Sequence, residues 1–289
     1  MATTPDIYRF RYRSIITLTV ASFVSGIGFL WPFFFNAHSH LRGLNNNLFY
    51  WIAVPIALTI LIVEISNDRL DAKSVALLGV LTALTAALRP MGAGAVGIEP
   101  MWFILILAAR VFGPAFGFVL GILTLFLSAF LTGGFGPWLA YQMFAAGWIG
   151  LGAGLLPQRL GSWNFRGKTE IGLLFIYGIF ASLLFGLLMD LQFWPWAIGS
   201  QTQLSYMPGS ALQDNLHRFI IFHFASSMAW DVPRAIFTSL LVLVAGPAVL
   251  FALRRTQRKA AFLTPIEFTQ HQKVGGEFST AREKEQKEV

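Results

Sequence analysis

The chain has 289 residues, of which 55% are apolar and only 12% are charged. Soluble domains usually carry about 25% charged residues, so this composition excludes a water-soluble domain and indicates an all-α integral membrane protein. The formal charge of +7 would suggest a nucleic-acid partner in a soluble protein, but its distribution along this chain indicates membrane topology and no nucleic acid.

Hydrophobic runs predict eight membrane-spanning helices, since a bilayer core of about 30 Å needs roughly 20 helical residues. The fourth run is short because Gly113-Pro114 follows it, and proline cannot continue the hydrogen-bond ladder of a helix. The eight predicted spans, in chain order, are 14–35, 48–65, 74–90, 100–112, 114–131, 138–157, 171–190 and 231–253.

Two segments before the last span are not simple membrane crossings. Residues 191–218 are predicted to form a long outside loop, and the aromatic residues 219–230 are predicted to form an interfacial or re-entrant helix over the outer face. The alternative is one long helix over 217–253, with Pro233 at its bend or in the first turn of a shorter helix. Residues 259–289 are polar and are predicted to form a disordered cytoplasmic tail.

The basic residues predict the orientation of the chain in a cell membrane. With the N-terminus inside, 17 of the 21 Lys and Arg residues fall in inside segments and three in outside segments, while Arg234 falls within the last span. Because Lys and Arg accumulate on the cytoplasmic side, we expect a multi-pass protein with both termini in the cytoplasm.

Motifs for enzyme chemistry are missing from the sequence. There is no cysteine, and neither His-Glu-x-x-His nor Gly-x-Ser-x-Gly occurs. Residues 161–169 (GSWNFRGKT) resemble a phosphate-binding loop, but five residues rather than four precede Gly-Lys-Thr. His38 and His40 lie in the first outside loop, where such a pair is usually exposed to solvent. We therefore expect no catalytic residue, no metal site and no cofactor.

A stripe of small residues lies on the third predicted span. Gly79, Ala83 and Ala87 recur every four residues, which places them on one helix face. Such a face lets another helix approach closely in lipid. It predicts a docking site for another subunit, and the alternative is packing within the bundle.

Candidate binding residues gather at the predicted outer side of the middle spans. Arg89 and Glu99 bracket a glycine-rich loop and are predicted to belong to a substrate gate, or else to pair or reach the membrane surface. Trp138, Tyr141 and Gln142 follow a second glycine-rich turn. Trp138 has the alternative role of an interfacial anchor.

Further candidates lie near the outer end of the last two spans. Asp231 and Arg234 are three residues apart, so they can pair on one helix face, and Trp230 precedes them. Asp190 ends the seventh span, and His223 is expected near the outer cavity. Charges at membrane depth are expensive and indicate function, although Asp231 has the alternative role of capping its helix.

The order of these segments resembles the substrate-binding S component of an energy-coupling factor (ECF) transporter. The segments that carry the resemblance are the Gly79/Ala83/Ala87 stripe, RPMGAGAVGIEPMWFILILAARVFGPAFGFVLG, LTGGFGPWLAYQMFAAGWIGLGAGLLP and WDVPRAIFTSLLVLVAGPAVLFALRR. The resemblance covers residues 74–258. It implies a two-helix transmembrane extension over 1–72, a six-helix S-component core over 73–258 and the tail.

The resemblance also implies a function and its partners. It implies capture of a vitamin or related micronutrient, of cobalamin type or smaller, at the outer face of the membrane. The expected partners are membrane lipid, a transmembrane coupling subunit docked on Gly79, Ala83 and Ala87, and two ATP-binding subunits that drive uptake. The implied substrate-binding residues are Arg89, Glu99, Trp102, Trp138, Tyr141, Gln142, Asp190, Trp194, His223, Trp230, Asp231 and Arg234.

Two other functions stay open from the sequence. One is an intramembrane lipid-modifying enzyme that would use Asp231, His223 or Asp190 as acid or base. The other is an autonomous permease, for which an internal repeat would be expected and none is evident.

Overall fold

The structure is a computed structural model, and it describes residues 12–34, 72–92, 97–197 and 202–262. The second predicted span, the histidines of the first outside loop and most of the predicted tail lie outside the described residues. The described helices, with one 3-10 turn and one two-stranded hairpin, are α1 (Tyr12–Phe34), α3 (Ala72–Leu88), η2 (Pro90–Gly92), α4 (Met101–Phe112), α5 (Pro114–Thr132), α6 (Trp138–Leu155), β1 (Arg159–Leu160), β2 (Trp163–Asn164), α7 (Lys168–Ala197), α8 (Leu212–Ser226), α9 (Met228–Val244) and α10 (Gly246–Phe262).

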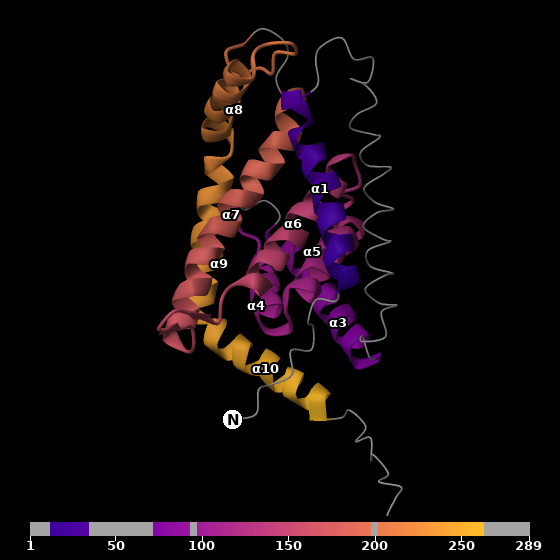
Figure 1. Cartoon of the computed structure of the whole chain (residues 1–289), viewed down its shortest axis with the longest axis vertical. Helices are drawn as coiled ribbons and strands as arrows, with labels where there is room; N and C mark the ends of the chain where they lie inside the picture. Colours follow the sequence, from indigo (N-terminus) through magenta and orange to yellow (C-terminus); the bar gives the residue numbers. More distant parts are fainter. Residues whose placement is uncertain (1–11, 35–71, 93–96, 198–201, 263–289) are drawn as a thin grey trace, which may run out of the picture.

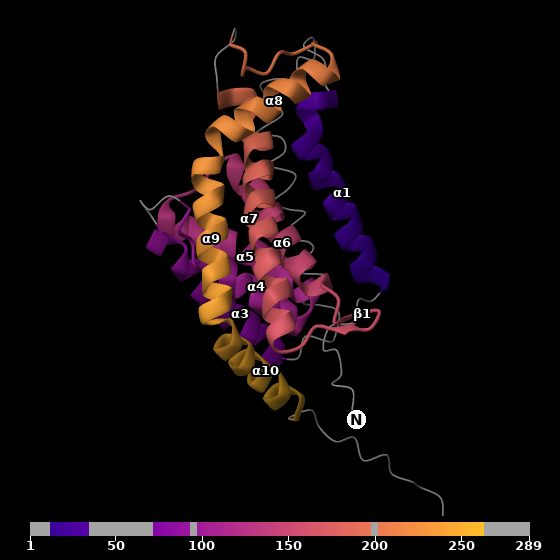
Figure 2. The same cartoon turned by 90° about the vertical axis from the view of Figure 1, so that its left-hand side faces the viewer.

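The helices form an elongated bundle (Figure 1). Helices α1, α7 and α9 run along its long axis, while α8 leans over one end and α10 crosses the other (Figure 2). Within the described part of the chain, three helices are long and apolar enough to cross a membrane, namely 74–92, α5 and α7. Helices α8 and α9 make a fourth if their bent pair is one crossing, and 18–33 and α4 are shorter apolar helices.

The short helix α4 forms the centre of the core. Met101, Leu105 and Ile106 are completely buried on it. The chain then reverses at Gly113, whose φ of +98° is favourable only for glycine, and Pro114 opens α5 at a position where its missing N–H is not needed. The predicted break at Gly113-Pro114 is therefore confirmed.

Helices α5 and α6 approach each other through glycines. A Cβ atom on Gly117 would lie 2.4 Å from the carbonyl oxygen of Gly150, and a Cβ on Gly121 would lie 2.4 Å from that of Ala146. Because no side chain intervenes, the two backbones pack directly, as small residues allow in membrane helices.

Helix α1 packs against the rest of the bundle rather than standing apart. Trp148 of α6 donates its indole N–H to the hydroxyl of Ser22 at 3.0 Å. The Tyr141 hydroxyl donates to the carbonyl of Gly28 at 3.3 Å, and the Tyr141 ring meets Phe29 edge-on at 4.9 Å. The N-terminal helix thus supplies part of the wall around α6.

The prediction of a single helix over 231–253 is wrong. Helix α9 ends at Val244, and α10 begins at Gly246 and crosses the base of the bundle (Figure 2). The physical reason is Pro247, which cannot donate a hydrogen bond to the preceding turn and therefore starts a new helix. Helix α10 also extends to Phe262, past the predicted core boundary at 258.

Other boundaries near the C-terminal half differ from the prediction. Helix α7 extends to Ala197, and α8 begins at Leu212, so helix replaces much of the predicted loop 191–218. Helices α8 and α9 meet at an angle of 60°. The break between them falls at Ser227 rather than at Pro233, which lies inside α9.

Candidate functional site

A cavity of about 410 Å³ lies between α7, α8 and the first turns of α9, toward the end of the bundle opposite α10. It has a polar side lined by Asp190, Ser226, Ser227, Asp231 and Arg234. It has an aromatic side lined by Phe185, Phe193, Phe222 and Trp230. This combination suits an organic solute that carries both a ring and polar groups.

Asp231 and Arg234 form the buried ion pair that their spacing predicts. Arg234 Nη1 donates to Asp231 Oδ1 at 2.7 Å, and both side chains are at most 9% exposed. Ser227 donates its hydroxyl to the other oxygen of Asp231. The guanidinium carbon of Arg234 lies 5.1 Å from the centre of the Phe185 ring, which adds a cation–π contact.

Glu99 joins this pair from the loop before α4. Its Oε2 accepts a hydrogen bond from the indole N–H of Trp102 at 2.7 Å and one from Arg234 Nε at 3.3 Å. Gly97 allows this segment to approach the first turn of α9, because a Cβ at Gly97 would lie 2.3 Å from the carbonyl oxygen of Trp230. The glycine-rich loop therefore rests directly on the start of α9.

Asp190 and His223 form a second polar pair at the same cavity. Asp190 Oδ2 lies 2.8 Å from His223 Nδ1, and Ser226 donates to the same oxygen at 3.5 Å. The pair links α7 to α8. His223 stacks on Phe219 with a centroid distance of 6.0 Å. Asp190 faces the cavity and His223 supports it from behind.

Arg89 and Gln142 form a separate cluster on α3, α5 and α6. Arg89 donates to the hydroxyl of Ser128 at 2.9 Å and to the side-chain carbonyl of Gln142 at 3.1 Å. Neither residue lines the cavity between α7, α8 and α9. Opposite charges still connect the two clusters, because Arg89 and Glu99 attract each other.

Four aromatic candidates have different surroundings. Trp138 is 45% exposed and donates to the carbonyl of Gly134. Tyr141 donates its hydroxyl to the carbonyl of Gly28 on α1. Trp194 is fully buried and donates to the carbonyl of Leu204 at 2.7 Å, away from the cavity. Trp230 lines the cavity and is 53% exposed.

Eight of the twelve residues that line the cavity were not among the candidates from the sequence, and three of them shape the site through specific contacts. Gly186 lies on α7 where a Cβ would overlap the Asp231 carboxylate, so its small size admits that side chain. Phe185 packs on Trp102 at a centroid distance of 4.4 Å, and Ser227 bonds Asp231. Gly186 comes four residues before Asp190, and this helical spacing is the one signal that could have identified it.

The small-residue stripe lies on the outside of the bundle. Gly79, Ala83 and Ala87 are exposed on α3, and a Cβ on Gly79 would meet no described atom within 4 Å. The opposite side of α3 packs inward, where Thr85 and Thr124 share a hydrogen bond of 2.6 Å. Within the described residues the stripe is therefore open to a partner helix.

The geometry of the cavity suits binding of a small solute. Across the described residues no three His, Asp or Glu side chains come together as a group that could hold a metal ion. The polar groups of the cavity are mostly satisfied by one another, on the walls of a membrane-embedded helical bundle. This arrangement is typical of the solute-binding subunit of a membrane transport system.

Comparison with known proteins identifies that system. Residues 73–246 match the family described as the substrate-specific component of ECF transporters. The match covers more than half of the chain, and the chain therefore belongs to this family. Its members are transport subunits, which fits a non-enzymatic role. No curated protein and no solved structure matches the chain.

Proposed function

We propose that this S component captures a vitamin or related micronutrient in the cavity between α7, α8 and α9. The observation that carries the proposal is the placement of Asp190, Asp231 and Arg234 around one cavity with aromatic walls. This arrangement supports an outward-facing site, since the basic end of the bundle lies opposite and the positive-inside rule puts that end in the cytoplasm.

The size of the cavity favours a compact vitamin over a cobalamin-type corrinoid. Sites for small molecules usually span about 300–1,000 Å³, and 410 Å³ lies near the lower limit. A solute with one or two rings would fill this volume. A corrinoid would need the loops around α8 to open.

The charges of the cavity favour a solute with N–H donors or a positive charge. Asp190 and Asp231 line the cavity with a single guanidinium, that of Arg234, which also bonds Glu99 beside the cavity. Arg234 already bonds two of these acids, whereas Asp190 contacts His223, Ser226 and Ser227 and no arginine among the described residues. Asp190 is therefore the group best placed to accept from the solute.

The proposed transport cycle requires partners that the chain does not itself supply. We infer that a transmembrane coupling subunit docks on the exposed Gly79, Ala83 and Ala87 face of α3. Two ATP-binding subunits then drive release of the solute to the cytoplasm. We infer from the distribution of basic residues in the sequence that the N- and C-termini face the cytoplasm.

The test is binding of a panel of vitamins to the protein purified in detergent. We expect one compound to bind, and Asp190→Asn to weaken it by roughly tenfold or more, because a hydrogen bond to a charged group contributes about 1.5–3 kcal/mol. Asp214→Asn is the matched control, since Asp214 is exposed on α8 and does not line the cavity. If the two variants bound the compound with equal affinity, Asp190 would not be part of the binding site.

A further inference from the structure

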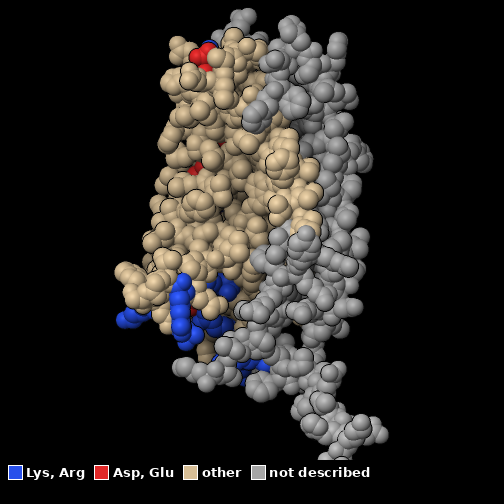
Figure 3. Space-filling model, in the orientation of Figure 1, with Lys and Arg blue, Asp and Glu red and all other residues tan. Residues whose placement is uncertain are grey.

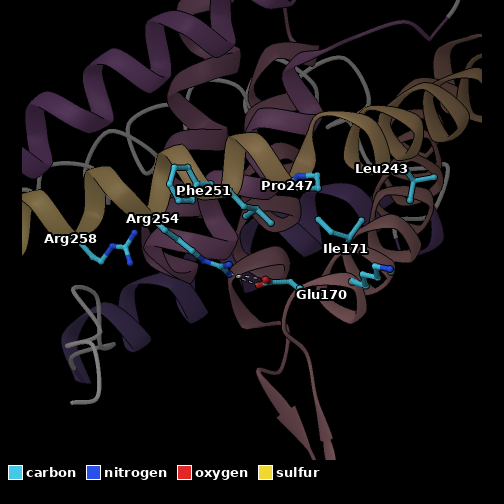
Figure 4. Close-up of a pocket in the computed structure, with 11 residues that line it drawn as sticks. Glu170, Ile171, Leu243, Pro247, Phe251, Arg254 and Arg258 are labelled. Carbon is cyan, nitrogen blue, oxygen red and sulfur yellow. Dashed lines mark hydrogen bonds and ion pairs between the residues drawn. The ribbon is translucent and has the colours of Figure 1, made fainter. Parts of the chain in front are cut away.

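A second and larger hollow lies at the other end of the bundle, beneath α10. It has a volume of about 770 Å³ and is bounded by the start of α7, the end of α9 and one side of α10 (Figure 4). Leu243 and Pro247 lie at one end of this groove, and Arg254 and Arg258 lie at the other. The groove is thus apolar toward the membrane-spanning helices and basic toward the end of α10.

The basic end is built on a buried carboxylate. Glu170 is 2% exposed, and it accepts hydrogen bonds from Arg110 Nε at 2.9 Å and from Arg254 Nη2 at 2.7 and 2.8 Å. Two guanidinium groups share this one acid, which leaves one positive charge in excess. Because both oxygens of Glu170 are engaged, Arg254 is held in place at the groove with part of its guanidinium exposed.

Two more cations at the rim have no partner among the described residues. Lys168 and Arg258 line the groove, are exposed, and make no hydrogen bond or ion pair with any described residue. On the face shown in Figure 3, most Lys and Arg side chains of the described residues gather at this end of the molecule. The groove therefore presents a net positive rim to an anionic group.

The apolar end continues into a groove along the membrane-spanning helices. A hollow of about 410 Å³ between α7 and α9 shares Leu243 with the basic groove and reaches to Val232. These two residues are separated along α9 by about 16 Å at 1.5 Å per residue. Half of a bilayer core of roughly 30 Å is about 15 Å, the depth that one acyl chain covers.

The apolar groove is open to the side, where lipid lies. Ile236 and Leu240 are 63% and 53% exposed along it. Its one lining hydroxyl, that of Ser239, is satisfied by the carbonyl of Phe175 at 3.1 Å. A hydrocarbon chain therefore meets no unpaired polar group in this groove.

We propose that this composite groove binds an anionic phospholipid, whose headgroup phosphate lies beside Arg254 and Arg258 and whose acyl chain follows α7 and α9, while Lys168 adds a further positive charge to the rim. The rim supplies the positive charge that a phosphate requires, and the adjoining groove has the length and polarity of a lipid chain. Helix α10 holds the headgroup at the membrane surface, as an amphipathic helix with a basic side does. The site is separate from the cavity between α7, α8 and α9, and its two α10 cations, Arg254 and Arg258, lie outside the segment that matches the family.

The experiment measures binding of dioleoylphosphatidylglycerol to the whole purified protein in detergent by native mass spectrometry. Dioleoylphosphatidylcholine, which has the same chains and no net charge, is the reference lipid. We expect phosphatidylglycerol to bind roughly tenfold or more tightly than phosphatidylcholine. The double variant Lys168→Gln/Arg258→Gln should abolish most of that difference, since each basic residue near a membrane surface contributes on the order of fivefold.

The matched control is Arg166→Gln/Arg255→Gln, which removes the same charge from exposed positions outside the groove. The preference of this control for phosphatidylglycerol over phosphatidylcholine should stay within about twofold of that of the natural protein. Equal loss in both double variants would mean that only the general surface charge acts, and would overturn the site. Full displacement of the lipid by millimolar inorganic phosphate would also overturn it, because the acyl groove would then contribute nothing. Equal binding of the two lipids would reject the proposal outright.

Discussion

Arg234 connects more of the candidate site than any other side chain described. Its guanidinium bonds Asp231 and Glu99, reaches the carbonyl of Ser182 at 3.4 Å, and lies against Phe185. These groups come from the loop before α4, from α7 and from α9. Arg234 therefore sets the shape of one wall of the cavity and balances the acids that would otherwise repel each other.

Replacing Arg234 with alanine should destabilise the protein and weaken solute binding. Asp231 is 1% exposed, and removing the partner of a buried ion costs about 3–5 kcal/mol. Thermal unfolding in detergent measures this effect. The double variant Arg234→Ala/Asp231→Ala should recover part of the lost stability, because no buried carboxylate is then left without its cation. A double variant no more stable than the single one would show that the pair is not coupled.

The sequence predicts some of these residue contacts and cannot predict others. Asp231 and Arg234 lie three residues apart on one helix, so local geometry alone indicates their pairing. Glu99 and Arg234 are far apart in the chain, as are Asp190 and His223, and their contacts depend on how whole helices pack. Gly186 was missed because its role is to leave space for Asp231, and only its helical spacing from Asp190 hints at a place beside the cavity.

At the scale of elements, the glycines between α5 and α6 fix the closest contact in the core. Gly117→Ala should weaken the fold, because its Cβ would lie 2.4 Å from the carbonyl oxygen of Gly150 and the helices would have to separate. Gly26→Ala on α1 is the matched control, with no described atom within 4 Å of the added Cβ. The thermal unfolding temperature should fall for Gly117→Ala. For Gly26→Ala it should stay the same or rise, since alanine favours a helix over glycine by about 1 kcal/mol. The opposite order would contradict direct backbone packing.

The exposed small-residue face of α3 gives a second prediction for an element. Ala83→Trp should abolish uptake in cells that contain the coupling and ATP-binding subunits, since a large ring blocks close helix approach. Vitamin binding to the isolated protein should stay unchanged, because Ala83 does not line the cavity.

The matched control for this face is Ile176→Trp, which adds the same ring at an exposed position of α7. This variant should transport normally. Equal loss of transport in both variants would mean that α3 is not the specific docking face.

Helix boundaries were predictable where proline and glycine interrupt the pattern visibly. Gly113-Pro114 was recognised as a break because proline cannot continue the hydrogen-bond ladder of a helix. Gly246-Pro247 is the same pair with apolar residues on both sides, and it was overlooked within a predicted span of ordinary length. Hydrophobicity alone therefore merges α9 and α10, although Pro247 is able to start a separate helix.

At the scale of the whole molecule, the basic residues separate the two ends of the bundle. The rim of the groove beneath α10, the hairpin β1–β2 and α10 all lie at the basic end, and the cavity between α7, α8 and α9 lies toward the other. Helix α1 joins the bundle along its length through Ser22 and Gly28. This polarity predicts which end faces the cytoplasm.

Cysteine labelling tests that orientation directly, since the natural chain has no cysteine. A membrane-impermeant maleimide should label Gln203→Cys, in the segment before α8, on intact cells. It should label Ser162→Cys, in the hairpin, only after the membrane is permeabilised. The reverse accessibility would invert the proposed topology and place the basic end outside.

The central claim is that the cavity between α7, α8 and α9 holds a vitamin or related micronutrient, and identifying the bound compound tests it most directly. The protein would be purified alone from cells grown in rich medium, and the small molecules released from it would be identified by mass spectrometry. We predict one vitamin, bound near one molecule per protein and lost in Asp190→Asn. A protein that carries no such compound and binds none of a vitamin panel would contradict the account.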